Sequence, residues 1–177
     1  MSHPDVPHRA PSLGVALAGF MGAGKSTVGA CVAERLALPF VDLDSWVVER
    51  SGLSSVSEIF AVEGEAGFRR REKEALQSIG AGPAVVLALG GGTIFVPGAL
   101  SLVRSSSVVV VLDVPWTVLA PRLRGDRSRP LAGRAEALFR ARSSGYSEAG
   151  VAVDGVGAPT VVAQRVIDAW RRECDSM

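Results

Sequence analysis

The sequence is poor in several residue types, and each shortage excludes a class of protein. Only two cysteines, Cys31 and Cys174, occur among the 177 residues. They lie far apart and match no zinc or dithiol spacing, which excludes a disulfide scaffold and indicates a reducing compartment. No apolar run approaches the roughly 20 residues that a membrane-spanning helix needs. The net charge is only +1, which gives no electrostatic basis for binding nucleic acid or a membrane, so we expect a cytoplasmic protein without either partner.

The composition that remains is typical of one globular domain. Apolar residues make up 47% of the chain, enough to bury a sizeable core, although aromatic residues make up only 6%. Residues 1–12 are polar, contain three prolines and lack the apolar stretch of a signal peptide. We expect residues 1–12 to form a disordered tail and residues 13–177 to form a single domain.

Apolar runs of strand length alternate along the chain with segments of helical periodicity. This alternation is typical of a parallel sheet covered on both faces by helices, the three-layer α/β class. Ligands bind such sheets beyond the carboxyl ends of the strands, so functional residues are expected there. The five predicted strands are 13–18, 40–43, 84–89, 108–113 and 151–153. The predicted helices lie near 25–37, 57–79, 97–104, 115–124, 133–146 and 158–173.

A glycine-rich loop after the first predicted strand carries the clearest chemical signal. It fits the pattern G-x-x-x-x-G-K-[ST], in which a strand, a glycine turn and a helix N-terminus surround an anion with backbone N–H groups. Its lysine is one of only two in the chain, against 17 arginines, and a compact ammonium on a slender stem suits a phosphate. The loop predicts a nucleotide-phosphate site, with a glycine-rich turn that binds nothing as the weaker alternative. The motif reads Gly19-Phe20-Met21-Gly22-Ala23-Gly24-Lys25-Ser26-Thr27.

Two carboxylates follow the second predicted strand. In Asp42-Leu43-Asp44, strand alternation points both acids to the same side if the strand continues through them. Two adjacent negative charges are costly unless a cation or a substrate hydrogen bond meets them. A P-loop kinase usually needs a carboxylate for its Mg²⁺, and the third strand ends without one, so Asp42 is the best candidate and Asp44 is left to face a substrate. The alternative for the pair is a turn and a helix cap at Asp44.

Three consecutive glycines and one arginine are the remaining candidates. Gly90, Gly91 and Gly92 follow a buried strand, so the backbone there approaches something closely or turns sharply; substrate contact and tight packing are equally open. Arg69 lies at the start of a predicted helix, where a cation opposes the helix dipole, which favours a contact with an anion over a surface position. The charged stretch 69–74 is mixed in sign, so most of it is expected to be a solvated face.

Together these motifs resemble those of the shikimate kinase family, P-loop enzymes with a fold like that of nucleoside-monophosphate kinases. The resemblance implies a five-stranded parallel sheet flanked by helices. It also implies transfer of the γ-phosphoryl group of ATP to the 3-hydroxyl of shikimate, with Mg²⁺ as cofactor. The similarity runs in family order from about residue 13 to the C-terminus. Besides the P-loop, the matching segments are Asp42-Leu43-Asp44, Glu58-Ile59-Phe60, Gly64-Glu65, Phe68-Arg69, Gly90-Gly91-Gly92, Leu112-Asp113 and Arg129-Pro130-Leu131.

The resemblance implies roles on the ATP side of the site. Lys25 and the backbone N–H groups of residues 22–27 would hold the β- and γ-phosphates. Ser26 would bind Mg²⁺, with Asp42 near the ion through water. Arg122 would lie against the adenine.

The resemblance implies further roles on the acceptor side. Asp44 would hydrogen-bond the shikimate hydroxyls and orient the attacking one or accept its proton. Arg69 and Arg142 would hold the carboxylate, a task that suits the planar fork of a guanidinium. Residues 90–92 would offer the substrate backbone N–H groups, and Arg129 would close over the transferring phosphoryl group.

Two regions of the domain and two other functions complete these expectations. The family pattern implies a substrate-binding region at about 43–72 and a lid at about 123–135. The segment from Arg129 is several residues shorter than that pattern, so the second carboxylate-binding residue could be Arg142, Arg140 or Arg134; the spacing Arg-x-x-x-Tyr to Tyr146 favours Arg142.

The other functions are a kinase of the same fold for gluconate or another small polyol or cyclitol acid, and a nucleotide- or shikimate-binding module without turnover. We expect a monomer.

Overall fold

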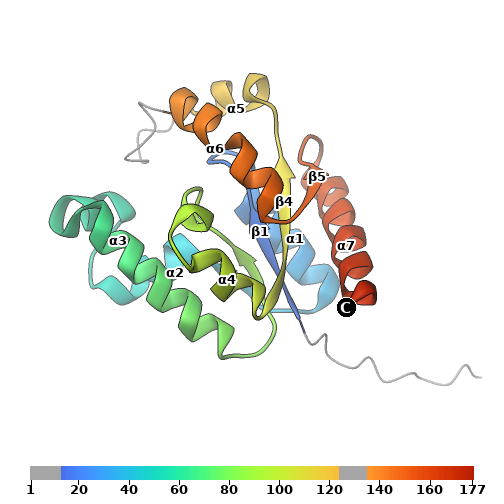
Figure 1. The fold of residues 1–177 in the computed structure, drawn as a ribbon, viewed down its shortest axis with the longest axis horizontal. Helices are drawn as coiled ribbons and strands as arrows, with labels where there is room; N and C mark the ends of the chain where they lie inside the picture. The colour runs from blue at the N-terminus through green and yellow to red at the C-terminus, as the bar shows by residue number, and fades with distance from the viewer. Residues whose placement is uncertain (1–12, 124–134) are drawn as a thin grey trace, which may run out of the picture.

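A five-stranded parallel sheet forms the centre of the molecule (Figure 1). The structure is a computed structural model that describes residues 13–123 and 135–177, so the predicted tail at 1–12 lies outside the described residues. All five strands are parallel to their neighbours, which confirms the predicted fold class. The order across the sheet is β2 (Phe40–Asp42), β3 (Val86–Ala88), β1 (Gly14–Ala18), β4 (Ser107–Asp113) and β5 (Val151–Asp154).

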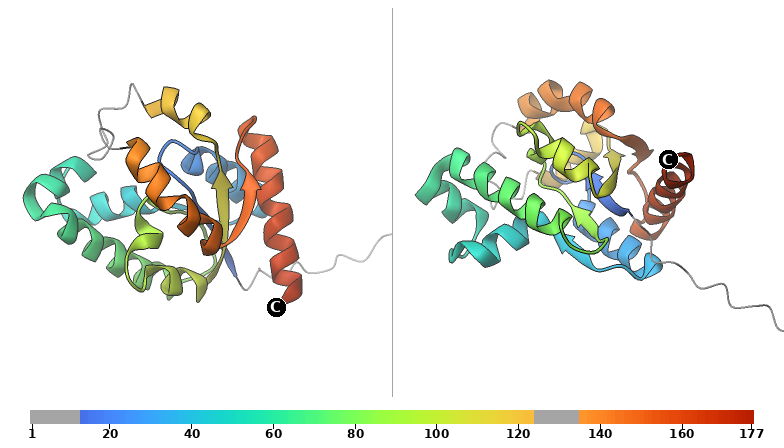
Figure 2. Two further views of the ribbon diagram at one scale, coloured as in Figure 1. Left: turned by 45° about the horizontal axis from the view of Figure 1, so that its top comes forward. Right: turned by 60° about the horizontal axis from the view of Figure 1, so that its bottom comes forward.

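Helices cover both faces of this sheet. One face is covered by α1 and α7, which also pack on each other, and the opposite face by α4 and α6, with α3 against α4 (Figures 1 and 2). Within the described residues, no helix combines the length and the apolar character needed to cross a membrane. The helices are α1 (Lys25–Leu36), α2 (Leu43–Ser51), α3 (Val56–Gly80), α4 (Ala99–Arg104), α5 (Trp116–Leu123), α6 (Ala135–Ala149) and α7 (Pro159–Ser176), with a 3₁₀ turn, η1 (Thr93–Phe95).

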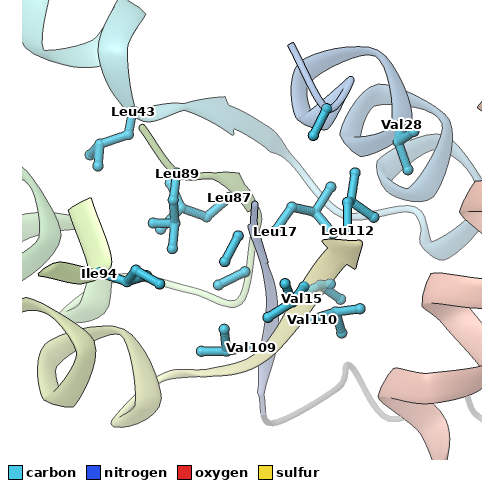
Figure 3. Packing of buried hydrophobic residues seen from close by; sticks show 14 of the residues in the cluster. Val15, Leu17, Val28, Leu43, Leu87, Leu89, Ile94, Val109, Val110 and Leu112 are labelled. Carbon is cyan, nitrogen blue, oxygen red and sulfur yellow. The ribbon is translucent and has the colours of Figure 1, made fainter. Parts of the chain in front are cut away.

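The core consists of aliphatic side chains on both faces of the central strands. Every residue of β1 is buried, as expected for a parallel strand covered on both sides. Figure 3 shows side chains of β1, β3 and β4 meeting Val28 of α1 on one side and Ile94 of η1 on the other. Burying a valine or leucine contributes roughly 1.5–3 kcal/mol, so these strands hold the loops at their carboxyl ends firmly in place.

The second strand ends earlier than predicted, and helix α2 was not predicted. The strand ends at Asp42 instead of Leu43, and it does not continue to Asp44, because the Asp42 side chain accepts a hydrogen bond from the backbone N–H of Ser45 at 3.1 Å and starts a helix. The helix cap is therefore Asp42 and not Asp44. Asp44 lies in the first turn of α2, so strand alternation does not orient the two acids.

Helix α3 contains a break at Gly64. The backbone there has φ 71° and ψ 178°, a combination that is essentially restricted to glycine. The helix predicted over 57–79 exists, but it consists of two helical segments that meet at this residue. Arg69 lies in the second segment shortly after the break, which agrees with its predicted place near a helix start.

Candidate active site

The P-loop joins the end of β1 to the start of α1 at the centre of the sheet. Gly22 and Gly24 have φ values of 79° and 92°, which turn the loop back toward the N-terminus of α1. Lys25 is buried, and its Nζ donates hydrogen bonds to the carbonyl oxygens of Gly19 at 2.8 Å and Phe20 at 3.0 Å. The loop thus holds its ammonium group beside the helix N-terminus, an arrangement that suits a polyphosphate.

A cavity of about 400 Å³ brings most of the predicted residues together at the carboxyl ends of β1, β2 and β3. The strands are neighbours in the sheet, so residues that follow them meet even though they are far apart in the sequence. The residues that line this cavity are Gly22, Gly24, Lys25, Ser26, Thr27, Asp42, Asp44, Leu89, Gly90 and Gly91.

Ser26 and Asp42 form the part of this cavity that could hold a divalent cation. The Ser26 hydroxyl donates a hydrogen bond to Oδ2 of Asp42 at 2.5 Å, while Oδ1 of the same carboxylate caps α2. Hydroxyl and carboxylate oxygens are the ligands that Mg²⁺ prefers, and Mg²⁺ usually takes its other ligands from water and phosphate. Within the described ranges, no group of three or more His, Cys, Asp or Glu residues is placed to hold a metal ion.

The glycine turn 90–92 lies tightly against charged side chains of the site. A Cβ at Gly90 would lie 2.8 Å from Oδ1 of Asp44, and a Cβ at Gly92 would lie 2.6 Å from Nη2 of Arg69. Both distances are too short for a real carbon atom, so a larger residue at either position would displace the Asp44 carboxylate or the Arg69 guanidinium from the turn. Tight packing was one of the two alternatives left open, and here the packing partners are themselves site residues.

Arg69 is held by two carboxylates, one exposed and one buried. Its Nη1 donates to Glu72 at 2.7 Å and its Nη2 to Glu65 at 3.1 Å. The Arg69 side chain is only 17% exposed and the Glu72 side chain 1%. Burial alone would lower the pKa of the Arg69 guanidinium, but the adjacent carboxylates of Glu72 and Glu65 together outweigh this effect, and the pKa is raised above its usual value.

Glu72 is a site residue that the sequence interpretation missed. It was assigned to a mixed-charge, solvated helix face, but it points inward and accepts a hydrogen bond from the hydroxyl of Thr93, which is completely buried. The available signal was its spacing of three residues after Arg69, which places both on one side of a helix. The inward direction of that side could not be read from the charges themselves.

Arg142 is the described arginine of α6 that reaches the site. Its Nη1 donates to the carbonyl oxygen of Gly91 at 3.2 Å, and the hydroxyl of Tyr146 donates to the same oxygen. Arg140 instead is 78% exposed and pairs with Glu136 at 2.7 Å. The third candidate, Arg134, lies outside the described residues.

Arg122 connects helix α5 to the P-loop. Its Nη1 donates to the carbonyl oxygen of Gly22 at 2.9 Å, which places the guanidinium at the rim of the loop. Arg129, predicted to act on the phosphoryl group, and most of the predicted lid at 123–135 lie outside the described residues.

Comparison with known proteins identifies the family. A family model described as shikimate kinase matches residues 21–171. The chain belongs to the shikimate kinase family. A shikimate kinase of Geobacter sulfurreducens is 43% identical over 149 residues, which cover 81% of this chain and 82% of that protein.

Solved structures agree with this family assignment. The shikimate kinase of Acinetobacter baumannii, solved in complex with shikimate, has a TM-score of 0.85 at 31% identity and covers 92% of this chain and 96% of its own. A gluconokinase from Sinorhizobium meliloti has a TM-score of 0.59 at 18% identity, with coverage of 95% and 97%. The gluconokinase shares the fold alone, so the predictions of a P-loop kinase fold and of a shikimate kinase are confirmed over the gluconate alternative.

Proposed function

We propose that this member of the shikimate kinase family transfers the γ-phosphoryl group of ATP to the 3-hydroxyl of shikimate. The proposal rests on the contacts of the glycine turn 90–92. Asp44 and Arg69 lie against its two ends, beside the cavity that the P-loop also lines. A carboxylate and a guanidinium so arranged match an acceptor that has both a hydroxyl and a carboxylate.

The ATP side of the site is built for charge stabilisation. Lys25 and the N–H groups of residues 22–27 bind the β- and γ-phosphates, and Arg122 lies against the adenine. Ser26 would hold Mg²⁺, with Asp42 near the ion through water, and the ion would supply positive charge to offset that on the phosphate oxygens. Because phosphoryl transfer asks a protein mainly for positioning and cations, no protein nucleophile is needed.

The acceptor side orients one hydroxyl for attack. Arg69 and Arg142 bind the carboxylate and residues 90–92 contact the ring substituents, which fixes the 3-hydroxyl near Asp44. The hydroxyl oxygen bonds to the γ-phosphorus, the bond from that phosphorus to the β,γ-bridging oxygen breaks, and the proton passes to Asp44. Arg129 is proposed to approach the phosphoryl group from the lid.

A coupled ADP-release assay with shikimate, quinate and gluconate tests the proposal. We expect ADP release that depends on shikimate, with much lower rates for quinate and gluconate. Asp44→Asn should lower kcat by about 10²–10⁴-fold while ATP still binds, because the general base is lost and the P-loop is intact. Well-folded protein that releases no ADP with shikimate would contradict the proposed function, and turnover of Asp44→Asn within a few fold would exclude Asp44 as the base.

The assignment of the carboxylate-binding arginines has a matched control. Arg142→Met and Arg69→Leu should both raise the KM for shikimate strongly and leave the affinity for ATP unchanged. Arg140→Met, a neighbouring substitution on the same helix, should change neither, since Arg140 is exposed and paired with Glu136. An equal effect of Arg140→Met and Arg142→Met would contradict the assignment.

A further inference from the structure

Phe95 is a large aromatic residue that stays 38% exposed at the edge of the site. It is the last residue of η1, which directly follows the glycine turn 90–92. The guanidinium carbon of Arg142 lies 5.2 Å from the centre of its ring, and the ring of Tyr146 meets it edge-on at 5.2 Å. A cation within about 6 Å of an aromatic face is attracted by the ring quadrupole. The exposed phenyl ring is therefore in contact with a cation of the proposed acceptor site.

Helix α6 contains a glycine where the Phe95 ring approaches it. A Cβ at Gly145 would lie 2.4 Å from Cε1 of Phe95, so any other residue would displace the ring. Glycine inside a helix lowers its stability relative to alanine. This glycine allows the ring to reach the α6 segment that carries Arg142 and Tyr146.

The two proposed carboxylate-binding arginines are held in different ways. Arg69 is paired with Glu65 and Glu72, which offset much of its charge. Arg142, within the part of the chain that the structure describes, has no carboxylate partner and is held by the Gly91 carbonyl and the Phe95 ring. A carbonyl and an aromatic ring fix a guanidinium without neutralising its charge, which stays available for an anion.

We propose that Phe95 is a positioning residue that presents the Arg142 guanidinium to the carboxylate of the acceptor. This inference rests on the proposed function, in which that carboxylate belongs to shikimate. The ring does not touch the substrate in this scheme; it restricts the orientations of the arginine before the anion arrives, and Gly145 provides the space that it needs.

Kinetics of Phe95 variants test the inference. Phe95→Leu keeps an apolar side chain but removes the aromatic face, so the KM for shikimate should rise about two- to fivefold while kcat and the KM for ATP stay unchanged. Phe95→Tyr keeps the aromatic face, so this variant should have the wild-type KM for shikimate. Gly145→Ala, which displaces the ring without altering it, should raise the KM to a similar extent, and combining it with Phe95→Leu should add little.

Two controls separate positioning of Arg142 from a general structural role. In an Arg142→Met background, Phe95→Leu should have no further effect on shikimate. With the methyl ester of shikimate, which has no carboxylate charge, wild type and Phe95→Leu should have equal kcat/KM. Equal losses for ester and acid, or failure of Phe95→Tyr to restore KM, would overturn the inference. A wild-type protein that fails to use shikimate would instead refute the proposed function.

Discussion

Replacing Glu72 by glutamine, with Glu65→Gln as its control, tests how the acceptor side is held together. Both carboxylates accept a hydrogen bond from Arg69, at 2.7 Å and 3.1 Å respectively. They differ in burial, because the Glu72 side chain is 1% exposed and that of Glu65 is 53% exposed. The two variants thus remove the same charge from the same arginine in two different environments.

The expected magnitudes follow from that difference. Removing one partner of a buried ion pair lowers the free energy of unfolding by about 3–5 kcal/mol, because the remaining charge is left without compensation. Arg69 is partly exposed and glutamine can still accept the hydrogen bond from Thr93, so we expect Glu72→Gln to lower the free energy of unfolding by about 2–3 kcal/mol. An exposed pair contributes about 0–1 kcal/mol, so Glu65→Gln should cost less than 1 kcal/mol.

Urea unfolding at pH 7, together with the KM for shikimate, measures both effects. Glu72→Gln should also raise that KM, since the Arg69 guanidinium loses the group that orients it. At a salt concentration of about 1 M the Debye length falls to about 3 Å, so the exposed pair of Arg69 and Glu65 is screened and the small effect of Glu65→Gln should disappear. The buried pair is screened much less, so most of the effect of Glu72→Gln should remain. Equal losses of stability in the two variants would refute the argument from burial.

Three further predictions concern neighbouring residues of the site. Tyr146 is the single tyrosine of the chain, and burial raises the pKa of its hydroxyl. In the folded protein, tyrosinate absorbance should therefore stay flat past pH 10, whereas in the unfolded protein it should rise near pH 10. The folded state holds this proton more tightly, so the stabilisation from Tyr146 is complete below pH 10 and is lost as the pH rises toward the folded pKa. The free energy of unfolding of Tyr146→Phe should not show this loss. Thr93→Val removes the only hydrogen bond to Oε1 of Glu72 within the described residues, while Arg69 still donates to Oε2, and should cost about 1–3 kcal/mol in urea unfolding; Thr93→Ser should cost less. Gly64→Ala imposes a strained backbone of order 1–3 kcal/mol and should raise the KM for shikimate through displacement of Arg69, with ATP affinity as the unaffected control.

The central strands and the P-loop could be predicted because their signals are local. Runs such as 108–112 consist of consecutive β-branched and other apolar residues, which are typical of a strand covered on both faces, and the P-loop motif specifies its own turn and helix start. Asp42, Asp44 and the first two glycines of the turn line one cavity because they follow parallel strands that end at the same edge of the sheet.

The features that were missed depend on contacts that the sequence does not display. Helix α2 begins where it does because the Asp42 carboxylate turns back onto the Ser45 N–H, a choice that competes with strand extension. Glu72 lies in a stretch of alternating charges, and only the position of α4 and η1 beside α3 decides which of those charges faces inward. The break at Gly64 could not be distinguished from an ordinary glycine within a helix.

The two oxygens of Asp42 connect the two halves of the site through a single side chain. Oδ2 accepts from the Ser26 hydroxyl at the start of α1, and Oδ1 holds the first turn of α2, in which Asp44 lies. Any change in the position of this carboxylate would therefore also move the start of α2, where Asp44 lies two residues further along the chain. By thermodynamic reciprocity, an acceptor that fixes the start of α2 changes the affinity for nucleotide by the same factor as nucleotide changes the affinity for acceptor. Asp42 thus joins the starts of α1 and α2 through the two oxygens of one side chain.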